Sequence, residues 1–266
     1  MPESPVPRRP EGGDLWVGTS WKMTKTLAQS REYARGLADR LAGSAPPGVQ
    51  PFVIPSHTAT STVSAELGSL SPVVLGVQNA HWEDEGAWTG EISVAQAKDA
   101  GAQLVEIGHS ERREHFHETV QTTRLKVAAV LRHGLIPLLC VGESEETRAS
   151  GGSTEHILAQ VGGALDGVGD HDLSRVLIAY EPIWAIGEQG RPASVEELQE
   201  PFAELHRSYG ERVAGLLYGG SVNLDNAAEL LAIEGVSGLF VGRTAWELAG
   251  YLDLLAIASE HATAGD

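Results

Sequence analysis

Glu181 stands at a position suited to proton-transfer chemistry. It directly follows an uninterrupted apolar and aromatic run at 176–180, and Pro182 and Gly187 come after it. Such a run predicts a strand buried on both faces, and parallel sheets bind ligands at the carboxyl ends of their strands. We interpret Glu181 as a general base beneath a mobile lid; the alternative is a strand-end carboxylate held in an ion pair.

Two further side chains have types that suit the same chemistry. In the segment GTSWKM, Lys22 lies two residues after Ser20, so in an extended chain both side chains point to the same side. The apolar neighbours of Lys22 favour a cation that binds phosphate over a plain surface lysine. His109 is the first polar residue after another apolar run, where it is either a structural histidine or a group that polarises a substrate or transfers protons.

Other polar residues near His109 are weaker candidates. Glu111 and the two arginines after it form a dense charge cluster of the kind that more often builds ion pairs than performs chemistry. The spacing of His109, His115 and His117 matches no standard ligand set, so we predict no metal site. Cys140 is the only cysteine, and its apolar neighbours predict a buried small hydrophobic residue rather than a nucleophile.

Glycine-containing loops follow the last strand-like runs and predict a phosphate site. Ser221 comes directly after a pair of glycines, and Arg243 comes directly after Gly242. Together with the loop at Gly187, these segments are expected to aim main-chain N–H groups at a phosphate, where barrel enzymes commonly bind one.

Eight apolar runs recur along the chain, with helix-length segments between most of them. The predicted strands are 15–18, 49–54, 72–77, 103–108, 135–142, 175–180, 212–219 and 238–242, and the predicted helices include 27–42, 122–133, 157–168 and 195–209. This alternation predicts a parallel α/β sheet, either open and doubly wound or closed into a (β/α)8 barrel. The count of eight, the chain length, and the polar or glycine residues after nearly every strand favour the barrel as a single domain over 14–260. No GxGxxG follows the first strand and no P-loop motif is present, so nucleotide-binding folds lose their main support.

Local signals refine two of these helices. Ser194 with Glu197 three residues later predicts a capping box at the start of the last one, and Pro201 inside it predicts a kink or a later start. Lys126, in the helix at 122–133, is predicted to lie on a solvated face.

Composition bounds the partners and the location. Against 19 Lys and Arg residues stand 36 Asp and Glu residues, and the resulting net charge of −17 argues against nucleic acid or an anionic membrane surface as a partner. No apolar stretch is long enough to span a membrane, the N-terminus is unlike a secretory signal, and a single cysteine suits a reducing cytoplasm. The proline-rich segment 1–13 is predicted to be a disordered tail, and 261–266 to fray.

Several motifs together resemble the triosephosphate isomerase family. They are WKM (21–23), QN (78–79), GAWTGEIS (86–93), IGHSERR (107–113), CVGE (140–143), AYEPIWAIG (179–187) and YGGSV (218–222), and they stand in the family's order. The resemblance covers about 15–258 and implies a homodimeric TIM barrel. It also implies isomerisation of a small phosphorylated sugar through an enediol(ate), with no metal or organic cofactor.

The resemblance implies roles for individual residues. Glu181 would shuttle the proton, His109 would donate a hydrogen bond to the carbonyl oxygen, and Lys22 would stabilise the anion with Glu111 beside it. Main-chain N–H groups of Gly187, Ser221 and Gly242 would bind the phosphate, and 182–192 would be the lid. At the subunit interface, Thr89 would lie in a loop that inserts into the partner, and Glu91 and Arg112 would help to fix the contact.

The chain departs from the family pattern at three places. Ser20 stands where the family has Asn, Arg243 stands where it has a second glycine, and the far end of the lid reads Gly-Arg-Pro at 190–192. Ser20 and Arg243 both line the predicted substrate and phosphate site. A proline at the hinge fixes φ and changes how the lid moves.

The segments GTSWKM and GLFVGRTAW look like the branch known as L-erythrulose-1-phosphate isomerase, which forms D-erythrulose 4-phosphate. Its substrate is dihydroxyacetone phosphate with one more hydroxymethyl group on the carbon that loses its proton, and the shorter Ser20 would make room for it. We expect this activity, with a place in erythritol catabolism. The alternatives are a triosephosphate isomerase proper, in glycolysis and gluconeogenesis, or a catalytically inactive binding barrel, which the joint presence of Lys22, His109 and Glu181 disfavours.

Overall fold

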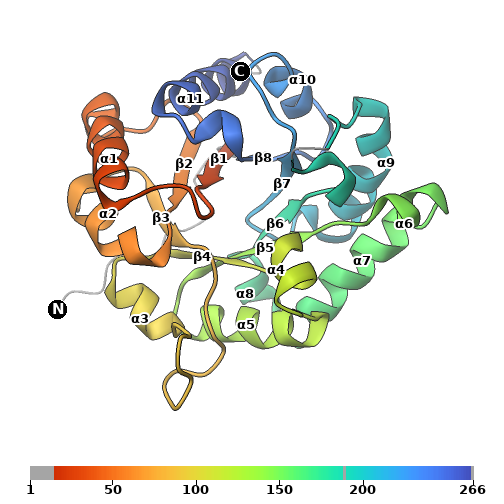
Figure 1. Cartoon of the computed structure of the whole chain (residues 1–266). Helices are drawn as coiled ribbons and strands as arrows, with labels where there is room; N and C mark the ends of the chain where they lie inside the picture. Colours follow the sequence, from red (N-terminus) through yellow and green to blue (C-terminus); the bar gives the residue numbers. More distant parts are fainter. Residues whose placement is uncertain (1–14, 188–189, 265–266) are drawn as a thin grey trace.

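A closed barrel of parallel strands forms the centre of the molecule (Figure 1). The computed structural model describes residues 15–187 and 190–264. Each strand pairs with the next in chain order, and β8 returns to pair with β1. The strands are β1 (Leu15–Ser20), β2 (Val49–Ile54), β3 (Val74–Val77), β4 (Leu104–Ile107), β5 (Ile136–Val141), β6 (Leu177–Tyr180), β7 (Gly215–Gly220) and β8 (Gly238–Val241). The predicted (β/α)8 barrel is confirmed, and the β1–β8 pairing rules out the open sheet.

Helices surround the barrel on its outside (Figure 1). They are α1 (Leu27–Leu41), α2 (Thr60–Leu67), α3 (Val94–Asp99), α4 (Ser110–His115), α5 (Val120–Arg132), α6 (Glu145–Ala149), α7 (Ser153–Ala164), α8 (Asp170–Leu173), α9 (Val195–Leu205), α10 (Ala227–Leu231) and α11 (Leu248–Thr263). Short helical turns complete the connections: η1 (His57–Ala59), η2 (Ile183–Ala185), η3 (His206–Gly210) and η4 (Arg243–Ala245).

Alternate strand residues fill the inside of the barrel with apolar side chains, because successive side chains of a strand point to opposite faces. This interior cluster consists of Trp16, Phe52, Ile54, Val74, Leu104, Ile136, Leu138, Cys140, Leu177, Ala179, Leu217 and Phe240. The prediction that Cys140 is buried is confirmed, and burial raises the pKa of its thiol well above the ordinary value. A larger apolar cluster lies between the strands and the helices. The packed interior leaves the mouth at the carboxyl ends of the strands as the place for polar groups.

The capping box predicted for α9 is confirmed. The Ser194 hydroxyl accepts from the Glu197 N–H, and the Glu197 carboxylate accepts from the Ser194 N–H. Pro201 does not delay the start of the helix, which begins at Val195 and runs to Leu205 before a π-helical turn at His206–Gly210. A strong N-terminal cap therefore holds the first turns in place although a proline follows.

The prediction that Lys126 lies on a solvated face is wrong. Its side chain is buried, its Nζ donates to Asn79 Oδ1 at 2.7 Å, and it forms an ion pair with Glu118, which also binds Arg112. Burial raises the pKa of Glu118, but the two cations outweigh it and hold the pKa below its usual range. Helical periodicity misses this arrangement because the partner Asn79 comes from a loop far away in the sequence.

The chain ends lie largely outside the described residues. The tail predicted at 1–13 is among the residues that the structure does not describe, whereas α11 continues to Thr263, within the segment predicted to fray. None of the described helices is long and apolar enough to cross a membrane.

Candidate active site

The residues predicted for catalysis meet at the carboxyl ends of β1, β4 and β6. Lys22 Nζ lies 2.7 Å from Glu111 Oε1, and Glu111 Oε2 lies 3.7 Å from His109 Nδ1. On the other side of the imidazole ring, His109 Nε2 lies 3.5 Å from Glu181 Oε2. These contacts make a continuous line of charged and polar groups across the mouth of the barrel.

The His109 side chain is held in one orientation by the start of α4. The residue is the N-cap of that helix, and its Nδ1 accepts a hydrogen bond from the Glu111 N–H at 3.2 Å. A neutral imidazole with this bond carries its proton on Nε2, the atom that faces Glu181. Burial opposes protonation of the ring, but the Glu181 carboxylate outweighs it, so the pKa of His109 is raised. In either protonation state, Nε2 is a donor aimed into the site.

Glu181 is a buried carboxylate that stays ionised. Burial raises its pKa, but attraction to His109 and a contact with the Cys140 thiol outweigh burial, so the pKa is lowered. One oxygen faces His109, and the other, Oε1, is buried without a hydrogen-bond partner among the described residues. A Cβ atom at Gly219 would lie 2.5 Å from Glu181 Cγ, so only glycine on β7 allows the side chain this place. The free oxygen makes Glu181 suited to accept a proton.

Lys22 is fixed by both its backbone and its charge. It is a non-glycine residue with φ of 49°, a strained conformation that its surroundings must maintain. Gln78 helps to maintain it, because Gln78 Nε2 donates to the Lys22 carbonyl at 2.8 Å. Burial, the largest single effect, lowers the pKa of Lys22, but the hydrogen bond to Glu111 and the nearby carboxylates together outweigh it, so the net pKa is raised and the ammonium keeps its charge.

The loops after β6, β7 and β8 contact one another at the predicted phosphate site. Ser221 Oγ donates to the Ala185 carbonyl at 2.8 Å, and Arg243 Nη2 donates to the Gly187 carbonyl at 3.1 Å. Gly242 directly precedes Arg243 at the start of η4. The arginine that replaces a family glycine therefore joins the β8 loop to the loop after β6.

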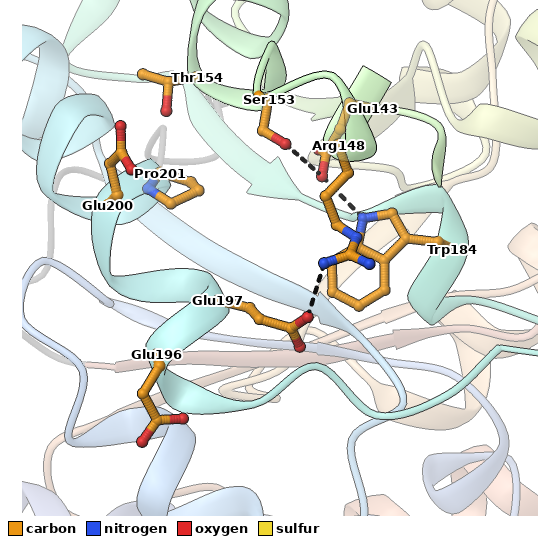
Figure 2. A pocket seen from close by; sticks show the side chains of 10 residues that line it. Glu143, Arg148, Ser153, Thr154, Trp184, Glu196, Glu197, Glu200 and Pro201 are labelled. Carbon is orange, nitrogen blue, oxygen red and sulfur yellow. Dashed lines mark hydrogen bonds and ion pairs between the residues drawn. The ribbon is translucent and has the colours of Figure 1, made fainter. Parts of the chain in front are cut away.

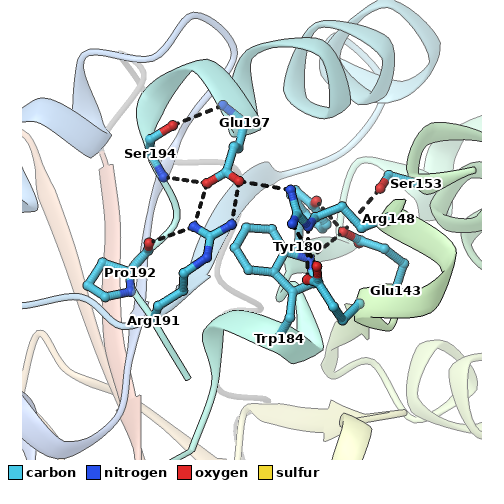
Figure 3. A network of polar contacts seen from close by, with 10 residues as sticks. Glu143, Arg148, Ser153, Tyr180, Trp184, Arg191, Pro192, Ser194 and Glu197 are labelled. Carbon is cyan, nitrogen blue, oxygen red and sulfur yellow. Dashed lines mark hydrogen bonds and ion pairs between the residues drawn. The ribbon is translucent and has the colours of Figure 1, made fainter. Parts of the chain in front are cut away.

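A network of polar contacts holds Trp184 and Arg191, which lie near the two ends of the predicted lid, 182–192 (Figure 3). Arg191 Nη1 donates to Glu197 Oε2 at 2.7 Å, and Arg148 Nη1 donates to Glu197 Oε1 at 2.9 Å. The guanidinium groups of Arg191 and Arg148 lie 4.5 and 4.8 Å from the centre of the Trp184 ring. Trp184 in turn donates from Nε1 to Glu143 Oε1 at 2.9 Å. Arg191, which directly precedes Pro192, is therefore held by Glu197 of α9.

Next to this network lies a cavity of about 210 Å³ (Figure 2). It is lined by Glu143, Arg148, Gly151, Ser153, Thr154, Trp184, Glu196, Glu197, Glu200 and Pro201. None of the residues predicted for catalysis lines it, and the Glu143 carboxylate in its wall already accepts from Ser153, Tyr180 and Trp184. This cavity is therefore separate from the predicted catalytic residues at the mouth of the barrel. Among residues 15–187 and 190–264, no group of three or more His, Cys, Asp or Glu side chains is arranged to hold a metal ion.

Two of the three residues predicted for a subunit interface lie in one exposed loop, and the third directly follows Glu111 in α4. Thr89 and Glu91 belong to the loop between β3 and α3, which protrudes from the barrel, and both are exposed (Figure 1). Arg112 pairs with Glu118 of its own chain, and its guanidinium lies 4.7 Å from the Phe116 ring centre.

Glu106, a buried carboxylate on β4, is not among the residues predicted from the sequence. Its side chain is 3% exposed, and Oε2 has no hydrogen-bond partner among the described residues. Burial, opposed by nearby His109, raises the pKa of Glu106 to about 7. The signal in the sequence is a single carboxylate inside the run QLVEIG, which is costly to bury without a purpose.

Comparison with known proteins shows the family. The family model for triosephosphate isomerase matches residues 15–258. A Mycolicibacterium smegmatis protein named L-erythrulose-1-phosphate isomerase is 68% identical over 247 residues, which cover 93% of this chain and 94% of that protein. A Mesorhizobium japonicum protein of the same name is 49% identical over 256 residues, covering 92% of this chain and 97% of that protein. The crystal structure of triosephosphate isomerase from Bartonella henselae superposes with a TM-score of 0.80 at 32% identity, covering 91% of this chain and 98% of that one.

The fold, the polar mouth of the barrel and these matches agree on the class of protein, an isomerase built on a (β/α)8 barrel. The chain belongs to the triosephosphate isomerase family. The predicted likeness to its L-erythrulose-1-phosphate isomerase branch is confirmed by the two relatives.

Replacement of Glu106 by Gln is expected to change the pH dependence of stability. Because the pKa of Glu106 in the folded state, about 7, lies above the ordinary 4.5, its contribution to stability is complete below the ordinary pKa and lost as pH rises through about 7. Between about pH 5 and pH 8, the free energy of unfolding of Glu106→Gln should therefore rise relative to the parent, by on the order of 3 kcal/mol at most. Denaturant unfolding across that pH range measures the difference. The exposed-site variant Glu155→Gln is the control, and a parent and Glu106→Gln that respond identically to pH would contradict the expectation.

Proposed function

We propose that this chain interconverts L-erythrulose 1-phosphate and D-erythrulose 4-phosphate. The observation that carries the proposal is the line of contacts from Lys22 through Glu111 and His109 to Glu181, which supplies a cation, a hydrogen-bond donor and a base at one place. The names of the relatives at 68% and 49% identity support the four-carbon substrate.

In the proposed mechanism, Glu181 removes the proton from C3 of L-erythrulose 1-phosphate, and the electron pair moves to the carbonyl oxygen on C2. His109 Nε2 donates a hydrogen bond to that oxygen, and the Lys22 ammonium stabilises the negative charge of the enediolate. Glu181 then returns its proton to C2, while the hydroxyl proton on C3 moves to the oxygen on C2. The carbonyl is now on C3, and the substrate has neither gained nor lost electrons.

The phosphate is proposed to bind main-chain N–H groups of Gly187, Ser221 and Gly242. Hydrogen bonds already connect the three loops that carry these residues, which supports a preformed cradle. Main-chain donors and the Lys22 cation are needed here because the net charge of −17 repels a phosphorylated sugar at long range.

Triosephosphate isomerase activity is the second candidate, since the same base, electrophile and cradle serve a three-carbon substrate. The 32% identity to the Bartonella henselae triosephosphate isomerase supports it less than the 68% identity supports the tetrulose phosphate. The three converging catalytic side chains give no support to an inactive barrel.

The proposed metabolic setting follows from the proposed substrate. We place the enzyme in carbohydrate metabolism, in erythritol catabolism rather than glycolysis. The single, buried cysteine is compatible with the proposed location in a reducing cytoplasm.

We also propose a homodimer that uses the protruding β3–α3 loop. Near the mouth of the barrel, Met23 is 98% exposed, and Trp88 in the loop is 49% exposed. Large exposed apolar side chains of this kind are typical of an interface. In the proposed dimer, the tip of the loop at Thr89 enters the partner, and Glu91 and Arg112 lie at the rim.

Comparison of two substrates tests the proposed reaction. The purified enzyme should have a higher kcat/KM for L-erythrulose 1-phosphate than for D-glyceraldehyde 3-phosphate. Glu181→Gln should lower kcat on the preferred substrate by at least about 100-fold, as expected for loss of a general base, whereas Glu155→Gln should not. Triose turnover near about 10⁸ M⁻¹s⁻¹ without tetrulose turnover would replace the proposal by its alternative.

Sedimentation equilibrium tests the dimer. The parent should sediment at twice the chain mass, and Thr89→Arg should shift the equilibrium toward monomer, because a bulky charge would have to be buried in the partner. Leu70→Arg, which changes an exposed apolar residue at the opposite end of the barrel, is the control. A parent that is monomeric at all concentrations tested would rule out the assembly.

A further inference from the structure

The two candidate substrates differ by one group, and an enzyme for the larger one must accommodate it. L-erythrulose 1-phosphate carries an extra hydroxymethyl group on the carbon that loses its proton. In the proposed binding mode, this hydroxyl is enclosed beside the reacting atoms, on the side of the carbon chain away from the phosphate. A buried hydroxyl left without a partner weakens binding, so the site needs a polar group at that place.

Glu106 provides a polar group on the inner face of the barrel. It lies two residues after Leu104 on β4, and Leu104 belongs to the interior cluster, so both side chains face inward. Its register partner on β5, Leu138, belongs to the same cluster. Glu106 is therefore a carboxyl group directly above an apolar interior, below the mouth where His109 follows the same strand.

Each of the four buried carboxylates has one oxygen without a hydrogen-bond partner among the described residues, but only Glu106 also lacks a protein partner for its other oxygen. Glu118 pairs with two cations, Glu143 accepts three hydrogen bonds, and Glu181 faces His109. Among the described residues, Glu106 has no ion pair within 4.0 Å, and its Oε2 is buried without a hydrogen-bond partner. Buried polar atoms without a partner are rare in folded proteins and often belong to a ligand site.

The neighbours of Glu106 place this unused oxygen at the reaction centre. The carboxyl group interacts electrostatically with His109, Glu181 and Lys22, and the Ser20 hydroxyl is close enough to lower its pKa. Ser20 ends β1 and is 4% exposed. Serine here stands where the family pattern has the longer Asn, so a shorter side chain with a hydroxyl group adjoins Glu106.

We propose that Glu106 and Ser20 form the subsite that binds the hydroxyl of the extra hydroxymethyl group and so select the four-carbon substrate. This assignment rests on the proposed function and deepens it. A three-carbon substrate leaves the same carboxyl group without a partner, which penalises its binding.

The protonation of Glu106 supports this role. With its pKa raised to about 7 by burial, the carboxyl group carries a proton for part of the time near neutral pH. It then donates as well as accepts, which suits a hydroxyl partner. It also limits the negative charge next to Glu181, which has to remain a base.

The test compares Glu106→Leu with Glu106→Gln on two ligands. Glu106→Leu should lower kcat/KM for L-erythrulose 1-phosphate by at least about 100-fold, because the hydroxyl loses its partner. The inhibition constant of 2-phosphoglycolate, which fills the phosphate cradle but has no hydroxymethyl group, should change by no more than about threefold. Glu106→Gln keeps a hydrogen-bonding group of the same shape and should stay within about tenfold of the parent on the tetrulose. Circular dichroism checks that both variants are folded.

The outcomes separate the possible errors. A parallel loss of tetrulose turnover and of 2-phosphoglycolate binding in Glu106→Leu would assign Glu106 to the whole site and overturn the subsite. Full tetrulose activity in Glu106→Leu would overturn it as well. If the parent itself does not turn over L-erythrulose 1-phosphate, the proposed function fails first and the subsite fails with it.

If the leucine variant does not fold, a tetrulose kcat/KM for Glu106→Gln equal to the parent's supports the subsite, and a loss of more than about tenfold overturns it.

Discussion

The burial of an ionised carboxylate beside an imidazole is the constraint on which the rest of this site depends. Glu181 and His109 face each other at 3.5 Å within the mouth of the barrel, and each holds the other's pKa away from its ordinary value. Such a pair is stable only if the surrounding groups fix both side chains and balance the charge. The Glu111 N–H fixes the ring, and the Lys22 ammonium supplies the compensating positive charge.

The barrel provides what this pair requires. Parallel strands end at one mouth, so residues far apart in the sequence become neighbours there, and Gly219 on β7 leaves the space that the Glu181 side chain occupies. The apolar interior of the barrel beneath the site excludes water, which strengthens the electrostatic interactions between the charged groups above it. Around the rim, the contacts of Ser221 and Arg243 connect the loops of the proposed phosphate cradle to the start of the lid. The residues that carry the proposed function therefore all lie at one end of the barrel, where the strands have their carboxyl ends.

Sequence reasoning reached the architecture because strand and helix signals are local. The apolar runs gave all eight strands with small errors at their ends, and the Ser194 capping box marked the start of α9 correctly. Features that depend on distant partners were not visible in the sequence. Lys126 was predicted to face solvent, although it is buried and contacts Asn79 and Glu118. The contact of Arg243 with the loop after β6 depends on the three-dimensional structure. Glu106 was overlooked because the sequence does not reveal which face of its strand points inward. Motifs led to the proposed catalytic groups and to Ser20, whereas Glu106, the other residue proposed to set the substrate, had to come from geometry.

The most direct test of the account is a crystal structure of the enzyme with a phosphorylated hydroxamate that mimics the planar enediolate. We expect the phosphate to bind the main-chain N–H groups of Gly187, Ser221 and Gly242. If the residues converge as proposed, the crystal structure will show this contact. We also expect the hydroxamate oxygens to lie between the Glu181 carboxylate and His109 Nε2, within hydrogen-bond distance of both. An analogue bound elsewhere would contradict the central claim that these groups converge on the substrate. So would an analogue bound in the barrel mouth whose hydroxamate oxygens lie beyond hydrogen-bond distance of both Glu181 and His109.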